Sequence, residues 1–168
     1  MHRTPGKLSF IIRPATSKDD DDLEEIFLIA RRQAFYWMDP QQFNLNDFKF
    51  QTEGESIYLA ETPEHKLAGF ISIWEPENFV HHLYVHPDYQ NLGVGKKLVQ
   101  NVVNLFGLPL RLKCLSKNTK ALAFYFSQNW IEKGKSEGEN GEYLNLTLDS
   151  NPKNKPITRS IPGSARLV

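Results

Sequence analysis

The sequence predicts a mixed α/β (α+β) fold in which helices cover one central sheet. Three observations lead to this prediction. Several segments alternate apolar and polar residues with the period of a strand, and others carry apolar residues at helical spacing. The two kinds follow one another in the order strand, helices, three strands, helix, strand, helix, two strands. The length of 168 residues suits one domain of this kind.

The chain begins with a short strand and a long helix. Residues 10–13 are mostly apolar, and Pro14 stops this strand. Residues 16–17 precede acidic side chains three positions on, which is a helix-start pattern, and apolar residues at helical spacing follow as far as Ala34. We interpret the aspartates at 19–22 as charges that complement the positive end of this helix, in preference to a metal site.

The middle of the chain predicts a meander of three strands. Residues 35–54 are aromatic and polar and fit a second short helix and a loop. Residues 56–61 and 67–74 have strand character and are joined by the turn-like segment 63–66, so we expect a hairpin. Residues 79–85 add the third strand.

The second half of the chain alternates helices with strands. We expect helices at 95–106 and 118–128, strands at 110–114, 130–134 and 143–148, and a Gly- and Glu-rich loop over 134–142. The domain then spans residues 1–148. Residues 149–168 are rich in Pro, Asn, Lys, Ser and Arg, and we expect a polar tail or a loosely docked arm.

Composition argues against several classes of protein. The 20 basic and 20 acidic residues cancel, so the chain lacks the basic excess of a nucleic-acid binder. No window approaches the roughly 20 apolar residues of a membrane span, and Met1–Lys7 has no apolar signal core, so the cytoplasm is the expected compartment. Cys114 is the only cysteine, which excludes an internal disulfide, and we place it in the core.

One loop carries most of the chemical information. The strand ending at Leu83-Tyr84-Val85 leads into a helix that opens at Gly93 and Gly95. Such a loop presents successive main-chain N–H groups at the positive end of a helix, which suits a phosphate. The two glycines lack the Cβ atoms that would keep a pyrophosphate away, and Lys96 and Lys97 add positive charge.

Glycine loops occur in several kinds of site. A dinucleotide-binding loop would carry a third glycine where Leu98 stands. A P-loop would carry its first glycine where Gln90 stands, and a hydroxyl after the lysine. Tight packing alone is the remaining alternative for two isolated glycines.

Two motifs in register decide between these alternatives, because they resemble the GNAT superfamily of N-acetyltransferases. Gln90-x-x-Gly93-x-Gly95 after a Leu-Tyr-Val strand is similar to the acetyl-CoA signature of that family. Residues 118–125 resemble its Asn-x-x-Ala-x-x-Phe-Tyr helix, and residues 12–16 resemble a common opening. The resemblance covers about residues 8–148. It implies a mostly antiparallel sheet splayed between its fourth and fifth strands, about four flanking helices, and transfer of an acetyl group from acetyl-CoA to a primary amine in a ternary complex.

The same resemblance implies the residues that contact acetyl-CoA. The main chain of the splayed strand pairs with the pantetheine arm, the loop holds the pyrophosphate, and Gln90 braces that loop. Asn118 contacts the far end of the pantetheine or the acetyl group. The implied contacts are Leu83, Tyr84, Val85, Gln90, Asn91, Leu92, Gly93, Val94, Gly95, Lys96 and Asn118. No metal is implied.

Transfer of an acetyl group from a thioester to an amine requires an acid and a base. The thiolate that leaves is a modest base, and the resemblance places the phenol of Tyr125 beside it; a core aromatic is the alternative for this residue. The acceptor amine has a pKa of about 10 and must lose a proton. Some family members use a Glu where Lys113 stands, so that base does not carry over. His81 shares the face of Leu83 by alternation and is our candidate base, with a structural histidine as the equal alternative.

The acceptor and the partners are less defined. We expect a small-molecule amine or a protein amino group, no nucleic acid and no membrane, and a homodimer stays open. In the family the acceptor lies across the sheet from CoA, and the aromatic residues Phe35, Tyr36, Trp37 and Trp74 are candidates for its pocket. The alternative function is a non-catalytic acyl-CoA-binding sensor or interaction module on the same fold.

Overall fold

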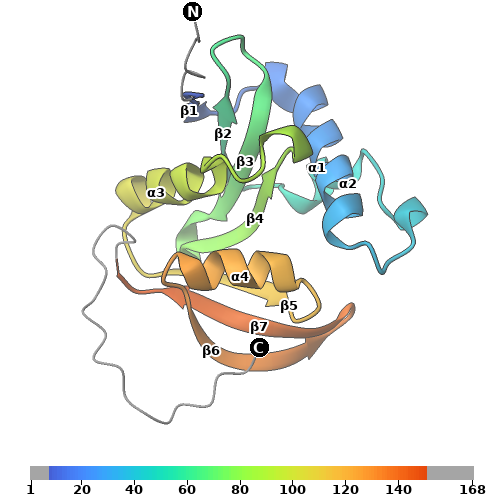
Figure 1. Ribbon diagram of the computed structural model, residues 1–168, viewed down its shortest axis with the longest axis vertical. Coiled ribbons are helices and arrows are strands. Elements are labelled where there is room, and N and C mark those ends of the chain that lie inside the picture. The colour runs from blue at the N-terminus through green and yellow to red at the C-terminus, as the bar shows by residue number, and fades with distance from the viewer. Residues whose placement is uncertain (1–7, 151–168) are drawn as a thin grey trace, which may run out of the picture.

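A single seven-stranded sheet runs through residues 8–150, the part of the chain that the computed structural model describes (Figure 1). Neighbouring strands are antiparallel except for β4 and β5, which are parallel. In sheet order the strands are β1 (Ile11–Pro14), β2 (Ser56–Glu61), β3 (Leu67–Trp74), β4 (Phe79–Val85), β5 (Leu110–Leu115), β7 (Gly141–Leu148) and β6 (Ile131–Gly138). The predicted mixed fold is confirmed. Most of the predicted polar tail lies outside the described residues.

Four α-helices within these residues cover the two faces of the sheet, and Figure 1 draws α3 and α4 in front of the strands. They are α1 (Asp20–Ala34), α2 (Asp47–Gln51), α3 (Val94–Phe106) and α4 (Thr119–Ser127). A small core under α1 and α2 contains Leu23, Ile26, Phe27, Phe48, Leu59 and Phe70. A larger core under α3 and α4 includes Ile71, Ile73, Val80, Leu98, Val99, Val102, Leu112 and Tyr125. Each helix therefore buries an apolar stripe against one face of the sheet, as amphipathic spacing requires.

The sheet opens between β4 and β5. These strands share one residue pair, Phe79 opposite Arg111, where the Arg111 N–H also donates to the Asn78 carbonyl at 3.1 Å. Asn78 fixes this closed end further, because its side-chain amide donates to the carbonyls of Phe106 at 3.3 Å and Pro109 at 3.4 Å. Beyond this end the two strands diverge, and the splay that we expected between the fourth and fifth strands is confirmed.

The divergence leaves main-chain groups of β4 facing the gap. His86 donates its N–H to the Ala68 carbonyl on the β3 side at 2.8 Å. Because the groups of an antiparallel strand alternate in direction, Leu83 and Val85 point their N–H and C=O groups away from β3. They therefore face the side where β5 has moved away.

A bulge in β4 changes which residues share a face. Ser72 of β3 lies opposite His82, and the next residue, Ile73, lies opposite Val80, so His81 is the extra residue. Val80 and Leu83 consequently pack in the same core although they are three positions apart. The expectation that His81 shares the face of Leu83 is wrong, because strict alternation does not pass through a bulge. His81 and His82 instead lie on the side of α1 and α2.

The last two strands are longer than expected. The predicted loop over residues 134–142 is wrong in most of its length, because β6 continues to Gly138 and β7 begins at Gly141. The two strands pair through Gly138 and Gly141, which leaves a two-residue turn. The polar composition of this segment resembles that of a loop. The segment nevertheless forms an edge strand, whose side chains lie on a mostly exposed surface. The overlooked signal is Asn140-Gly141, where the turn passes into β7 and Gly141 has a φ of +110°.

Candidate active site

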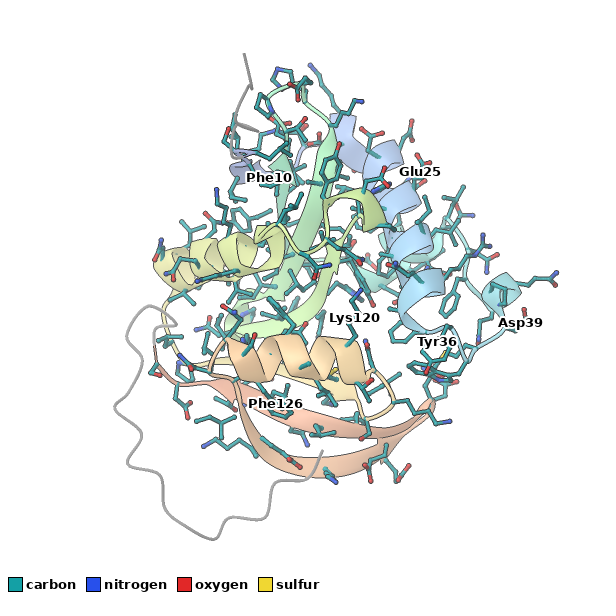
Figure 2. The ribbon with its side chains drawn as sticks, in the orientation of Figure 1. Phe10, Glu25, Tyr36, Asp39, Lys120 and Phe126 are labelled. Atoms are coloured by element: carbon teal, nitrogen blue, oxygen red, sulfur yellow. The ribbon has the colours of Figure 1, made fainter. Side chains whose placement is uncertain are left out.

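A first cavity of about 530 Å³ lies between the end of α1, the loop from β4 to α3, and the start of α4. Every residue that we expected to contact acetyl-CoA lines this cavity except Leu92, whose side chain points outward and is 49% exposed. Two of the other lining residues, Tyr36 and Lys120, are labelled in Figure 2, where they lie near the end of α1 and on α4. The two sequence motifs thus meet around one space.

Gly93 is the N-cap residue of helix α3, and no capping side chain accepts from the first main-chain N–H groups of this helix. The φ of Gly93 is +82°, the left-handed region that favours glycine, and as N-cap it offers no side-chain acceptor to the first turn. The first N–H groups of a helix have no partner within the helix, and here none is taken by a capping side chain. The positive end of α3 and the amides of Val94, Gly95 and Lys96 therefore line the first cavity ready for an anion.

Gly95 has a different reason to be glycine. A Cβ at this position would lie 3.1 Å from Cζ of Phe124, so the missing side chain lets α3 approach α4 closely. Gly93, by contrast, has no heavy atom within 4 Å of where its Cβ would be. Backbone conformation thus explains Gly93, whereas helix packing explains Gly95.

Gln90 ties three parts of the first cavity together. Its side-chain amide donates to the Val85 carbonyl at 3.1 Å and to Oε1 of Gln33 at 2.7 Å. Its own Oε1 accepts from Nζ of Lys120 at 3.0 Å. The side chain thus links β4, α1 and α4 at the base of the loop that we expected it to brace.

Asn118 and Tyr125 stand at the two ends of the lining surface of α4. Oδ1 of Asn118 accepts the N–H of Ala121 at 3.3 Å, which caps the helix. Tyr125 is 8% exposed and packs edge-on against Trp130 with ring centres 5.5 Å apart. Burial, with smaller contributions from Cys114 and Tyr84, holds the pKa of the Tyr125 phenol well above its ordinary value. The phenol therefore stays protonated and can donate a hydrogen bond.

A second cavity of about 440 Å³ lies on the side of α1 and α2. It shares five lining residues with the first cavity: Leu83, Tyr84, Asn118, Ala121 and Tyr125. These residues belong to β4 and α4, which border the opening in the sheet. The two cavities therefore adjoin at the splay, with the Tyr125 ring on the boundary.

His82 lines the second cavity as a neutral imidazole. Its ring is stacked on Tyr84 and packs edge-on against Phe27 at 4.9 Å between ring centres. Burial lowers the pKa of His82 to about 4, against a smaller opposing effect of its bond to Gln51. Nε2 of His82 lies 3.3 Å from the Gln51 carbonyl, which only accepts, so this nitrogen carries the proton.

His81 also lines the second cavity, beside a carboxylate that sequence analysis missed. Nδ1 of His81 contacts Oε1 of Glu55, the residue before β2, whose side chain is 3% exposed. Oε2 of Glu55 is buried with no hydrogen-bond partner among the described residues. Burial lowers the pKa of His81, and the positive charge of Lys113 lowers it further. Glu55 lies outside both motifs and follows a turn, so no pattern in the sequence marks it.

The other cations and anions of the second cavity are engaged or exposed. Arg31 is 5% exposed, donates to Oδ2 of Asp47 at 3.0 Å, and lies over the Phe27 ring at 3.8 Å. Asp47 also accepts the Asn44 N–H at 2.9 Å. Lys113 sits at the edge of the cavity, 5.1 Å from the Tyr143 ring centre.

The remaining candidates divide between core and cavity. Phe35 lines the second cavity and Tyr36 the first, whereas Trp37 and Trp74 line neither. Cys114 is buried at the wall of the second cavity, and burial raises the pKa of its thiol to about 12, so it is inert as a nucleophile. Among residues 8–150 no cluster of His, Cys, Asp and Glu has a metal-binding arrangement. In the same range no helix combines the length and the hydropathy that a membrane span needs.

Comparison with known proteins agrees with this arrangement. The sequence model of the acetyltransferase (GNAT) family matches residues 21–128. A search of curated proteins finds no match. A GCN5-related N-acetyltransferase from Rhodopseudomonas palustris is similar in structure, with a TM-score of 0.70 and 20% identity over 89% of this chain and 100% of that one.

Two further solved structures extend the comparison. The PaiA N-acetyltransferase of Thermoplasma acidophilum, solved with coenzyme A, has a TM-score of 0.71 and 16% identity over 85% of this chain and 100% of its own. A mutant of the spermidine N-acetyltransferase SpeG of Vibrio cholerae has a TM-score of 0.61 and 13% identity over 83% of this chain and 93% of its own. At these identities the structures share the fold, and the match to the family's sequence model carries the assignment. The chain belongs to the GNAT family of acetyltransferases.

Proposed function

We propose that the protein is an N-acetyltransferase that moves the acetyl group of acetyl-CoA directly to a primary amine in a ternary complex. One observation carries this proposal: two cavities adjoin at the splay beside Tyr125 and share five lining residues of β4 and the α4 segment. A reaction between two bound molecules needs such a meeting point, because attack requires the reacting atoms to be within about 3.5 Å.

The first cavity suits acetyl-CoA. The free amides at the start of α3 fit a diphosphate, and Lys96 and Lys120 add positive charge at its wall. The N–H and C=O of Leu83, which point away from β3, fit the amides of a pantetheine arm laid along β4 as an additional strand. Acetyl-CoA placed in this way would bring its thioester to the boundary with the second cavity.

The second cavity would hold the acceptor amine. The neutral amine nitrogen attacks the thioester carbon, a C–N bond forms, and the oxygen that becomes negative can accept the N–H of Val85. The imidazole of His81 takes one proton from the nitrogen. The C–S bond then breaks, and the Tyr125 phenol supplies the proton that turns the departing thiolate into a thiol. The proton on His81 returns through water to the Tyr125 oxygen, which restores the enzyme. The products are the N-acetyl amine and CoA.

Charge around the second cavity favours some acceptors over others. Asp47 is paired with Arg31, and the Glu55 side chain is only 3% exposed and lies behind His81, so neither carboxylate is open to a cationic group in the cavity. Lys113 is exposed at the edge of the same cavity. We therefore expect an amine that carries a neutral or anionic group, such as an amino acid or a peptide amino terminus, to react better than a polyamine.

Release of thiol from acetyl-CoA tests the function. The acceptor panel should contain amino acids, a neutral alkylamine, a peptide with a free amino terminus, and spermidine. We expect release with at least one acceptor, and faster release with amino acids or peptides than with spermidine. Tight binding of acetyl-CoA without release for any acceptor would contradict catalysis and favour the sensor. Fastest release with spermidine would contradict the charge argument alone.

A further inference from the structure

We propose that Glu55 is the positioning residue of His81, fixing its tautomer and stabilising its protonated form. This inference deepens the proposed function and rests on it for the source of the proton. Nδ1 of His81 contacts Oε1 of Glu55. A carboxylate only accepts hydrogen bonds, so in the neutral ring Nδ1 carries the proton and Nε2 is left with a free lone pair. Nε2 is then the atom that can receive a proton from the amine.

The backbone holds Glu55 in place from a turn at the end of α2. The Glu55 N–H donates to the Thr52 carbonyl at 3.0 Å, and Gly54 has a φ of +77°. A Cβ at Gly54 would lie 3.3 Å from Cζ3 of Trp74, so the turn is tight against β3. One residue further on, β2 begins. The carboxylate is therefore attached between a hydrogen-bonded turn and a paired strand, as a positioning group requires.

Burial explains why this carboxylate matters to its neighbour. The Glu55 side chain is 3% exposed, and Oε2 has no partner among the described residues. A buried negative charge with one free oxygen is poorly solvated, so a positive charge that forms beside it is stabilised strongly. A proton arriving on His81 supplies that charge. Glu55 therefore offsets part of the cost that burial and Lys113 impose on a protonated His81.

The surroundings of His81 leave this role to Glu55. The charged and titratable groups around the ring are Glu55, Lys113 on β5 and His82 beside it on β4, with the Arg31–Asp47 pair on the same cavity. Lys113 opposes a second positive charge, and His82 stays neutral at its lowered pKa. Glu55 is therefore the group that compensates a protonated His81.

Two variants separate charge from hydrogen bonding. Glu55→Gln keeps the size and an acceptor for Nδ1 but removes the charge, whereas Glu55→Leu removes both. Glu53→Gln is the matched control, because Glu53 is an exposed carboxylate on the same turn. Thermal melting and the Kd for acetyl-CoA establish that each variant is folded and binds in the first cavity.

The first readout does not need activity. Nitrogen-correlated NMR of the imidazole rings reports the tautomer and the pKa of His81. We expect the Nδ1–H tautomer in the wild type and in Glu55→Gln, a pKa lower by about one unit or more in Glu55→Gln, and a change of tautomer in Glu55→Leu. An unchanged His81 pKa and tautomer in both variants would overturn the proposal, even if melting temperatures fall.

The second readout is turnover with the best acceptor of the panel. We expect kcat to fall about 10-fold in Glu55→Gln and about 100-fold in Glu55→Leu, with the acetyl-CoA KM unchanged. The acid limb of the kcat–pH profile should move to lower pH in Glu55→Gln. An unchanged kcat and profile would overturn the proposal. If the wild type releases no thiol with any acceptor, the proposed function fails, and the NMR titration still decides whether Glu55 sets the state of His81.

Discussion

At the scale of single residues, Tyr125 occupies the boundary between the two cavities with a phenol that keeps its proton. We predict that Tyr125→Phe lowers kcat about 100-fold, because the thiolate then leaves without a positioned acid. The Kd for acetyl-CoA should stay within about twofold, since the ring and its packing on Trp130 remain. Steady-state kinetics and isothermal titration measure the two effects.

Tyr58→Phe is the matched control for this variant. Tyr58 packs against the same large core and lines neither cavity. Its loss of a hydroxyl should leave kcat as in the wild type. Equal kcat values for Tyr125→Phe and the wild type would remove Tyr125 from the chemistry and leave it a core aromatic.

The residues that sequence can predict are those held by local patterns. Gly93 has a left-handed backbone and Asn118 caps a helix. Both roles depend on a few neighbouring residues in the sequence. Strict alternation puts His81 on the wrong face, because the bulge depends on how β3 and β4 align and not on β4 alone. Glu55 meets His81 across a distance of 26 residues, so no local pattern could find it.

At the scale of elements, Gly69 lets β3 and β4 lie against the start of α3. A Cβ at this residue would lie 2.8 Å from the Tyr84 carbonyl oxygen and 3.1 Å from Cγ1 of Val94. We predict that Gly69→Ala lowers the free energy of unfolding by about 1–3 kcal/mol, because the backbone of β4 must shift. The Kd for acetyl-CoA should rise, since Val85 and Val94 line the first cavity. Chemical denaturation and titration calorimetry measure both.

Gly134→Ala provides the comparison in the same sheet. Gly134 lies in β6, and a Cβ there would meet no heavy atom within 4 Å. Its substitution should leave stability and acetyl-CoA affinity close to the wild-type values. If Gly69→Ala behaves in the same way, the close approach of β3 to α3 is not what shapes the first cavity.

Elements with a buried face were predicted well, and exposed elements were not. The apolar stripe of α3 and the alternation in β5 and β7 arise from contact with the core, which fixes their period. Strand β6 lies at the sheet edge and pairs only with β7, so its residues are free to be Gly, Glu, Lys and Ser. Main-chain hydrogen bonds pair β6 with β7, and these bonds do not require particular residue types.

At the scale of the whole molecule, the first cavity draws its walls from both sides of the splay: α1, β4 and α3 on one side, and α4 on the other. A ligand seated there should stabilise the entire fold. At 100 times its Kd, acetyl-CoA adds about 2.7 kcal/mol to the free energy of unfolding. We predict a rise of roughly 5–10 °C in the melting temperature. Differential scanning calorimetry measures it.

Acetyl-pantetheine is the control ligand for this shift. It lacks the diphosphate that the amides of α3 would bind, so the same concentration should raise the melting temperature much less. An equal shift with acetyl-pantetheine would show that the start of α3 makes no contact with the nucleotide half. In that case the phosphate site would have to lie elsewhere.

The splay itself came from the family resemblance and not from the residues of β4 and β5. Each of these strands has an ordinary apolar pattern, and nothing in that pattern says that they share a single pair. The closed end depends on Asn78, which adopts a φ of +47° and reaches across to the carbonyls of Phe106 and Pro109. Such a contact between distant segments exists only once the whole sheet has formed.

The opening between β4 and β5 also bears on how such a site changes over evolutionary time. What faces the gap at Leu83 and Val85 is peptide backbone, which every non-proline residue carries alike. Mutations can therefore accumulate along this strand without erasing the groups that recognise a ligand. Solved structures with only 13–20% of their residues in common with this chain still superpose on it with TM-scores of 0.61–0.71. Under the proposed function, the acceptor is selected by side chains of the second cavity, which can change without loss of these main-chain groups.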